Sequence, residues 1–365
     1  MLSLKRNFTL HFDWISFCIT ISLGLIGLFF VMSATYMPEQ PYSIFFKKQL
    51  LGLLSGLLIY ALAVTCDYRT LMRYGYFAYF TVIALLLFTI IKGSIGMGAQ
   101  RWINLGFVKL QPSELCKLLL PAFISYYFYT HHDKHKTFQD FAPIITMLFI
   151  TVILVLKQPD LGTAILILLS GIILLLHAGF KKKWMISFLL LALVSAPLSW
   201  RMLKPYQKKR VLVFLGEGEA HKERYQIEQS KIAIGSGGLF GKGYRKGTQN
   251  IFQFLPESRT DFIFAVIAEE WGFFGAIGML LLYLVLFLRL LSQTSLIDDA
   301  NIQLLALGLI IHIILSTYIN IFMVLGLLPI VGIPLPLMSY GLSNLWVVLA
   351  SLGWFSGIMM HRPLR

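Results

Sequence analysis

The sequence predicts an all-α, polytopic membrane protein, and three observations support this fold class. The 365-residue chain is 57% hydrophobic, whereas a soluble domain is about 45–50% apolar. Only 13% of its residues are charged, and its mean hydropathy is +0.75. Apolar runs near the membrane-spanning length of about 20 residues recur along the whole chain. Strands are not expected, because only helices and closed barrels satisfy backbone groups in lipid.

We expect about ten transmembrane helices in a single membrane domain, residues 1–365. One large extracytoplasmic loop, at about 201–261, lies between the seventh and eighth helices. The first run is longer than the core of a signal peptide, about 7–15 residues, so we expect it to be retained. The predicted runs are 14–35, 50–66, 75–91, 115–130, 141–156, 161–179, 184–200, 262–290, 301–327 and 343–360.

Basic residues predict the orientation of the chain. An even number of spans places both termini on one side, whose short segments hold twelve Lys and Arg against seven in the opposite short loops. The positive-inside rule therefore predicts cytoplasmic termini. The net charge of +14 is also a property of nucleic-acid-binding proteins. A basic outer loop on a membrane protein instead favours an anionic headgroup or a phosphate-bearing ligand.

Cysteine and histidine usage indicates neither a disulfide framework nor a metal site. The three cysteines lie in or beside apolar runs, and the eight histidines show no zinc spacing.

Chemistry-bearing residues concentrate in four segments that we predict to lie on the outer side: 93–117, 157–163, the loop ending at Asp261, and 320–344. The cytoplasmic connections are short and plain. A channel would instead place polar residues through the full depth of several helices. This asymmetry predicts a functional site at the outer membrane face.

In the first segment, Pro112 suits the first turn of a helix and Ser113 is able to cap it. Glu114 and Lys117 are three residues apart and so share a helical face. Two interpretations stand: an ion pair that lets both side chains enter the membrane edge, or one wall of a site. Arg101 lies just upstream, in a Gly-rich loop long enough to fold over a cleft.

In the second segment, Asp160 follows a proline and precedes an apolar run, so it is either a helix N-cap or an exposed carboxylate near a site. In the long loop, "QSKIAIGSGGLFGKG" superficially resembles a phosphate-binding loop. It fails the Walker pattern at Ser236 and Gly243, so we reject nucleotide binding. Its glycines more readily serve a tight backbone turn near a bulky headgroup.

In the fourth segment, Pro329, Pro334 and Pro336 with several glycines forbid a regular helix. Irregular backbone at membrane depth is tolerated where it is buried in protein or lines a cavity. Ser343 is able to cap the last helix.

The stretch "PESRTDF" allows two interpretations. Ser258 at N-cap and Asp261 at N3 fit a capping box. Alternatively, the neighbouring Arg259, and Glu269 on roughly the same helical face, indicate a cleft lined by carboxylates. As a general base, Asp261 would need a raised pKa. A helix N-terminus and Arg259 lower that pKa and apolar surroundings raise it, and the sequence leaves the balance open.

These segments together resemble the SEDS family (shape, elongation, division and sporulation), and within it the RodA branch more closely than the FtsW branch. The resemblance covers all ten apolar runs. The stretches that carry it are "GAQRWINLG", "QPSELCK", "QPDLGT", "QSKIAIGSGGLFGKG", "FLPESRTDFIFAVIAEEWG" and "GLLPIVGIPLPLMSYG". One departure follows "SYG", where Leu342 stands in place of the family's usual glycine.

The resemblance implies a peptidoglycan glycosyltransferase that polymerises lipid II at the outer face of the bacterial cytoplasmic (inner) membrane during cell elongation. It implies a class B penicillin-binding protein and other membrane proteins of the elongation machinery as partners, with no nucleic acid. Two alternatives stay open. One is a lipid II flippase or other transporter, for which polar residues such as His177, His312 and Asn320 would line a path. The other is a non-catalytic activator of a penicillin-binding protein.

By the same resemblance, Asp261 in the Thr-Asp-Phe motif is the catalytic base, and Glu114, Lys117 and Asp160 match other functionally important positions. The reaction would proceed with inversion and release undecaprenyl diphosphate. No cofactor is required, although a divalent cation (Mg²⁺ or Mn²⁺) could help. Ser339 is expected to contact substrate, and the candidates for neutralising the diphosphate are Arg101, Lys117, Arg210, Lys242, Arg245 and Arg259.

Overall fold

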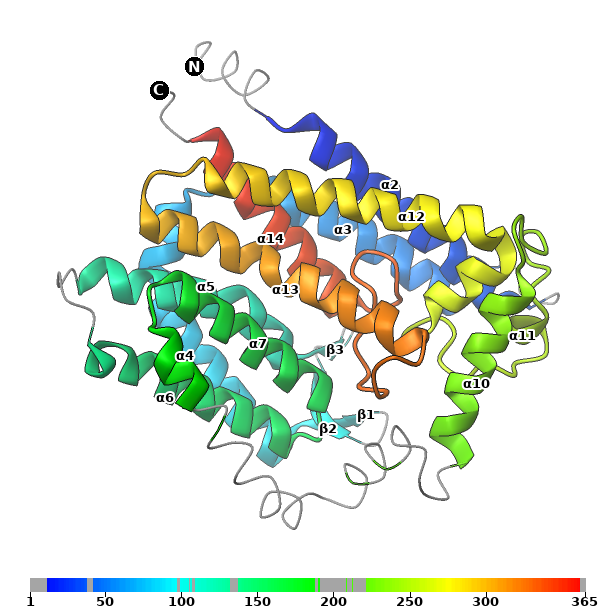
Figure 1. Ribbon diagram of the computed structural model, residues 1–365, viewed down its shortest axis with the longest axis horizontal. Coiled ribbons are helices and arrows are strands. Elements are labelled where there is room, and N and C mark those ends of the chain that lie inside the picture. The colour runs from blue at the N-terminus through cyan, green and yellow to red at the C-terminus, as the bar shows by residue number, and fades with distance from the viewer. Residues whose placement is uncertain are drawn as a thin grey trace.

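Long helices lying side by side form the body of the molecule (Figure 1). The computed structural model describes residues 12–37, 42–96, 99–104, 106, 109–131, 137–187, 190, 208, 212 and 221–361. In these residues, nine of the ten predicted runs fold into helices: α2 (Trp14–Ala34), α3 (Ile44–Thr65), α4 (Tyr68–Lys92), α5 (Pro112–Thr130), α6 (Phe138–Lys157), α7 (Leu161–His177), α12 (Ile263–Ser295), α13 (Ala300–Val324) and α14 (Leu342–Met360).

Seven of these helices are long and apolar enough to cross a membrane, so the described residues support a multi-pass membrane protein. The exceptions are α5 and the 17-residue α7. The predicted run 184–200 lies mostly outside the described residues. The predicted total of ten spans therefore remains a prediction.

Two helices, α3 and α4, begin six and seven residues earlier than their apolar runs, where polar side chains cap them. Ser43 accepts a hydrogen bond from the backbone N–H of Phe46, and α3 starts at Ile44 rather than near 50. Asp67 caps α4 in the same way, through the N–H of Arg69. An N-cap acceptor satisfies a backbone donor at the helix start, so a helix can extend beyond its apolar stretch.

Three short strands lie between α4 and α5: β1 (Ser94–Gly96), β2 (Ala99–Asn104) and β3 (Lys109–Leu110). They pair antiparallel in the order β1-β2-β3. The expectation that the chain forms no strands is therefore wrong for this segment. The constraint behind it applies to lipid-exposed backbone, and this segment lies between the apolar runs, so its edges need not face hydrocarbon.

Two helices, α13 and α14, occupy the centre of the bundle. In each, 67% of the most apolar window is buried, against 28–44% for the other candidate spans. Close packing at small residues brings α14 against α3. A Cβ at Gly52 would meet the side chain of Leu342 at 2.5 Å, and one at Gly353 would meet the carbonyl oxygen of Tyr60 at 2.5 Å. The unexpected Leu342 thus fills the space over Gly52 at the start of α14.

The start of α2 and the end of α14 lie at the same end of the bundle (Figure 1). The rings of Phe17 and Tyr60 are 5.3 Å apart, and the Tyr60 hydroxyl hydrogen-bonds Ser356 at 2.8 Å. This arrangement agrees with an even number of spans.

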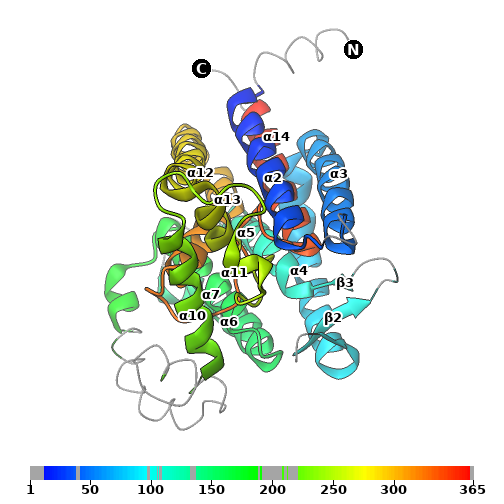
Figure 2. The ribbon, with the colours of Figure 1, turned by 90° about the vertical axis from the view of Figure 1, so that its right-hand side faces the viewer.

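The opposite end carries the strands and two further helices, α10 (His221–Ser236) and α11 (Thr248–Ile251) (Figure 2). We call it the site end. The predicted 201–261 loop is thus not a featureless loop in its described part. Its helix α10 packs on the bundle, where Ser230 Oγ donates to the carbonyl of Val324 at 2.7 Å.

An ion pair ties α2 to the far end of α12. Arg289 donates to Asp13 at 2.7 Å and Gln293 donates to it at 2.6 Å. Burial raises the pKa of Asp13. The hydrogen bonds from Arg289, Ser16 and Gln293 outweigh this effect, so the pKa lies below its usual value.

Replacing this carboxylate should lower the melting temperature only where it is ionised. We expect Asp13→Ala to cost about 1–2 kcal/mol at pH 7, because the lost hydrogen bonds are charge-assisted and Arg289 is partly exposed. A carboxylate whose folded-state pKa is depressed contributes its stability above its unfolded pKa, near 3.8 here. Thermal melts in detergent should show a difference in melting temperature between wild type and Asp13→Ala at pH 5–7, and this difference should disappear below about pH 4. A difference unchanged at acid pH would place the stabilisation elsewhere.

Candidate functional site

Asp261 lies in a series of turns just before α12, not inside the helix. The helix begins at Ile263 with Phe262 at the N-cap. The predicted capping box of Ser258 and Asp261 is therefore wrong. So is the prediction that Asp261 and Glu269 share a helical face. The backbone preceding the helix is bound by partners from a different part of the chain, and these override the local capping pattern.

These partners belong to α13 and to the Pro/Gly-rich stretch 325–341, which we call the return segment. Asn320, at the end of α13, donates from Nδ2 to the carbonyls of Asp261 and Ile333, both at 2.8 Å. A Cβ at Gly332 would lie 3.7 Å from Oδ2 of Asp261, so the carboxylate faces this glycine. One buried amide thus sets the position of the Asp261 backbone against the return segment.

Ser339 holds the other end of the return segment. Its hydroxyl donates to the carbonyl of Thr260 at 2.5 Å and accepts from the backbone N–H of Leu335 at 2.8 Å. The N–H of Tyr340 donates to the carbonyl of Arg259 at 2.9 Å. The sequence predicted that Ser339 contacts substrate. In the structure its hydroxyl joins the backbone of Thr260, next to Asp261, to the backbone of Leu335 in the return segment.

Helices α3 and α12 also bind the return segment. Gln49 donates to the carbonyl of Ser339 at 3.1 Å and accepts from the N–H of Gly341 at 3.3 Å. The Tyr283 hydroxyl of α12 donates to the carbonyl of Pro336. Irregular backbone at membrane depth is stable only when such partners satisfy it, which agrees with its predicted place inside the protein.

A second polar cluster joins the start of α7 to the strands. Asp160 caps α7 through the N–H of Thr163 at 3.2 Å, as predicted. It also pairs with Arg101 of β2 at 3.2 Å and accepts from Gln111 Nε2 at 2.7 Å. The side chain of Asp160 is only 2% exposed, so its charge is compensated inside the protein.

The predicted pair of Glu114 and Lys117 forms with a 2.7 Å separation and is almost fully buried. Asn344 of α14 donates to Glu114 at 3.0 Å. The ion-pair interpretation is thus confirmed. The pair lies beside α14, so the second interpretation, in which it forms one wall of a functional site, also stays open.

The return segment connects the start of α7, where Asp160 lies, to Asp261. A Cβ at Gly162, in the first turn of α7, would lie 2.5 Å from the carbonyl oxygen of Val331. Only a residue without a side chain lets the return segment approach this closely. The adjacent Gly332 faces Asp261, so α7, the return segment and the Asp261 turns meet at one place.

The predicted diphosphate-binding cations fall into two groups. Arg101, Lys117 and Lys242 each form an ion pair, the last with Glu269 at 2.7 Å. The others lie over aromatic rings: Arg245 is 4.3 Å from the ring centre of Tyr36, and Arg259 is 4.0 Å from that of Phe45. Arg210 lies outside the described residues.

Two predicted caps are wrong. Pro112 opens α5 as predicted, but Gln111 is the N-cap residue and Ser113 accepts a hydrogen bond from its side chain. Ser343 lies inside α14, which follows Gly341, and its hydroxyl donates to the carbonyl of Lys109 at 3.0 Å. The Ser113 hydroxyl thus binds the N-cap residue of its own helix, and the Ser343 hydroxyl binds β3.

Sequence reasoning missed the amide side chains that assemble the site. Gln49, Gln111 and Asn344 attracted no attention, and Asn320 was noted only as a polar group in a span. Each is buried in or beside an apolar helix. An amide side chain within or beside an apolar run is the sequence signal that could have identified these residues, because a buried amide must find hydrogen-bond partners.

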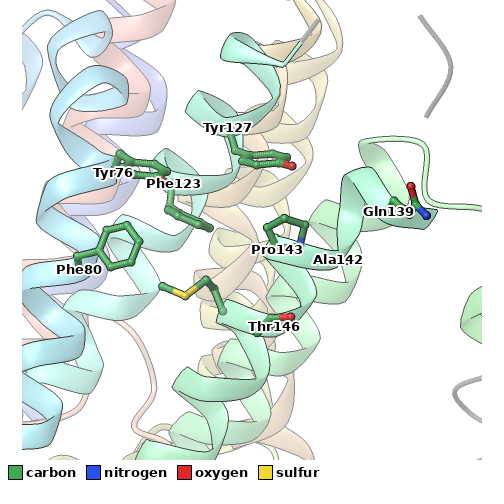
Figure 3. A pocket seen from close by; sticks show the side chains of 9 residues that line it. Tyr76, Phe80, Phe123, Tyr127, Gln139, Ala142, Pro143 and Thr146 are labelled. Carbon is green, nitrogen blue, oxygen red and sulfur yellow. The ribbon is translucent and has the colours of Figure 1, made fainter. Parts of the chain in front are cut away.

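A hollow among the described residues lies away from this site. A groove of about 530 Å³ between α4, α5 and α6 is lined mainly by aromatic and apolar side chains, among them Tyr76, Phe123 and Pro143 (Figure 3). These residues lie toward the ends of the three helices that are remote from the strands. The groove is therefore separate from the Asp261 cluster. Among the described residues, no group of three or more His, Cys, Asp or Glu side chains could hold a metal ion.

Known proteins are similar to this chain in sequence and in fold. The family model described as cell cycle protein of the FtsW, RodA and SpoVE type matches residues 13–363. Peptidoglycan glycosyltransferase MrdB of Escherichia coli K12 is 39% identical over 313 residues, covering 85% of this chain and 84% of the relative.

Two solved structures are similar over nearly the whole chain. One, described as structural coordination of polymerization and crosslinking by a peptidoglycan synthase complex, has a TM-score of 0.81 at 28% identity and covers 95% of this chain and 97% of its own. The rod shape determining protein RodA of Thermus thermophilus has a TM-score of 0.73 at 27% identity, with coverages of 97% and 98%.

Removing the amide of Asn320 should loosen the site. Asn320→Ala leaves the carbonyls of Asp261 and Ile333 without their donor, at a cost of about 1–3 kcal/mol for each buried group that stays unpaired. Asn320→Asp, which sets an oxygen against two carbonyls, should cost at least as much. Thermal melts in detergent measure the effect, with Asn301→Ala near the start of the same helix as the control. Equal melting temperatures for wild type, both Asn320 variants and Asn301→Ala would show that the hydrogen bonds from Asn320 to Asp261 and Ile333 do not stabilise the fold.

Proposed function

This chain belongs to the FtsW, RodA and SpoVE family of cell cycle proteins, and we propose that it is a peptidoglycan glycosyltransferase that polymerises lipid II. The observation that carries the proposal is the position of Asp261. Its partly exposed side chain faces Gly332 where the return segment, α12 and α13 meet, with buried charged clusters at the neighbouring helix starts.

We propose an inverting transfer in one displacement. The 4-hydroxyl of an acceptor N-acetylglucosamine attacks the anomeric carbon of the donor's N-acetylmuramic acid, while Asp261 takes the hydroxyl proton. The new glycosidic bond forms as the bond to undecaprenyl diphosphate breaks, so an α-linked donor yields a β-linked strand. A carboxylate is suited to this task when it lies within hydrogen-bond reach of the attacking hydroxyl.

Departing diphosphate carries negative charge that needs neutralisation. Arg259 lies two residues from Asp261, and Arg101 lies beside Asp160. We propose Arg245 and Arg210 as further sources of positive charge, whereas the charge of the buried Lys117 is compensated by Glu114. A divalent cation, Mg²⁺ or Mn²⁺, arriving with the diphosphate would act alongside them. Loss of polymerisation in EDTA, restored by either ion, would support this addition.

We also propose the cellular setting. The similarity to a peptidoglycan synthase complex supports a class B penicillin-binding protein as the partner. The basic-residue balance supports cytoplasmic termini, and with this orientation the site end would lie at the outer face of the bacterial inner membrane. The similarity to MrdB and RodA supports a role in elongation, alongside other membrane proteins of that machinery.

The structure gives little support to a transporter. His312 hydrogen-bonds Ser351 at 2.9 Å inside the bundle, and His177 lies near Gln303 at 3.1 Å, at an exposed position. Asn320 belongs to the site. These three residues thus have separate structural roles and do not line one path.

Asp261→Asn should abolish glycan polymerisation while leaving the fold intact. The amide keeps the shape of the side chain but does not take up the hydroxyl proton, so we expect a loss of at least about 100-fold, the lower end for general-base catalysis. The assay supplies lipid II to purified protein with its penicillin-binding partner. Thermal melts and co-purification of the partner serve as controls.

The same experiment separates the alternatives. A non-catalytic activator predicts full polymerisation by Asp261→Asn, and a transporter predicts no polymer from the wild-type protein in detergent, where nothing has to be moved across a membrane. Either result would overturn the proposed function.

A further inference from the structure

The glycine-rich stretch 237–247 joins α12 at a break in that helix. Gly272 has φ +67° and interrupts the helical backbone. In an unbroken helix, the N–H groups of Phe273 and Phe274 would bond the carbonyls of Glu269 and Glu270. Here the N–H of Phe273 donates to the carbonyl of Gly238 at 2.8 Å, and the N–H of Phe274 to that of Leu239 at 3.2 Å.

The two released carbonyls find partners in the same stretch. The N–H of Lys242 donates to the carbonyl of Glu269, and the N–H of Gly243 to that of Glu270, both at 3.0 Å. Each hydrogen bond lost inside α12 is thus replaced by one to the stretch. A Cβ at Gly241 would lie 2.1 Å from the carbonyl oxygen of Glu270, so this exchange requires glycine. That contact accounts for glycines that superficially resemble a phosphate-binding loop.

The side chain of Glu269 continues the connection. Its Oε1 accepts from Lys242 Nζ at 2.7 Å, from Thr248 Oγ1 at 3.0 Å and from the backbone N–H of Gln249 at 3.2 Å. The Glu269 side chain is 1% exposed and that of Lys242 is 26% exposed. We call these four residues the Glu269 clasp.

The Glu269 clasp closes a loop that contains Asp261. Thr248 and Gln249 begin the segment 248–269, and Glu269 ends it, so one carboxylate holds both ends together. Asp261 lies between them, outside regular helix. Glu270 secures the same region to α2, because its Oε1 accepts from Ser33 Oγ at 2.5 Å.

We propose that Glu269 and Lys242 are positioning residues, and that the Glu269 clasp holds the 248–269 segment so that Asp261 meets the acceptor hydroxyl. This proposal rests on the proposed glycosyltransferase function. It reassigns Lys242, whose charge is already compensated by Glu269, from binding the diphosphate to fixing the segment. A misplaced base lowers the rate of the chemical step more than it weakens substrate binding.

The test compares Glu269→Ala, Glu269→Gln, Lys242→Met and the Glu269→Ala/Lys242→Met double variant in the polymerisation assay with lipid II and the penicillin-binding partner. We expect Glu269→Ala and Lys242→Met each to lower kcat by about tenfold or more, with KM within about twofold of wild type. The double variant should be no more than about twofold slower than the slower single variant, because the two residues act as one unit. Glu269→Gln, which keeps Oε1 as an acceptor, should retain at least about a third of the wild-type rate.

The matched control is Glu228→Ala. Glu228 pairs with Arg224 at 3.0 Å on an exposed face of α10, where an ion pair contributes little, so its rate should equal that of wild type. Hydrogen exchange gives a second readout. In Glu269→Ala, residues 248–262 should lose amide protection while α14 keeps its own.

Three results would overturn the proposal: a raised KM for lipid II in Lys242→Met with kcat unchanged, multiplicative losses in the double variant, or unchanged protection of residues 248–262. If Glu269→Ala does not yield folded protein, Lys242→Met carries the same comparisons, because Glu269 then keeps its bonds to Thr248 and Gln249. A wild-type protein that makes no polymer would refute the proposed function instead, and the exchange experiment would still test the Glu269 clasp.

Discussion

The site depends on satisfying irregular backbone at membrane depth. The return segment 325–341 leaves many of its own N–H and C=O groups without helical partners, and lipid offers none. Asn320, Ser339, Gln49 and Tyr283 supply those partners from four parts of the chain. Because Asn320 and Ser339 also bind the backbone at Asp261 and Thr260, the requirement that stabilises the return segment also places the carboxylate.

Local sequence rules predicted the features that depend on neighbouring residues. The apolar runs gave the helices, Pro112 opens α5, Asp160 caps α7, and Glu114 pairs with Lys117 one turn away. Each involves residues within about one helical turn, so composition and spacing contain the necessary information.

The same rules failed where distant segments compete for the same groups. Ser258 has the right spacing for a capping box, but Ser339 and Asn320 bind the backbone around it from 59 to 79 residues away. The sequence did not reveal the role of Glu269, because its partner Lys242 lies 27 residues earlier. Lys242 belongs to the glycine-rich stretch 237–247, whose glycines the sequence analysis attributed to a turn near a headgroup. Family resemblance identified Asp261, yet only the assembled backbone explains why its carboxylate faces Gly332.

The break at Gly272 separates two mechanical tasks within one helix. Residues 273–295 of α12 rise about 34 Å at 1.5 Å per residue, enough to cross the hydrocarbon layer alone. Residues 263–271 instead follow Asp261 and are almost entirely enclosed by protein. The two parts meet at Gly272, where the N–H groups of Phe273 and Phe274 bond the carbonyls of Gly238 and Leu239 instead of those of Glu269 and Glu270. The shorter part, and Asp261 just before it, is therefore held by protein contacts at the site end, whereas the longer part has the length to meet the lipid.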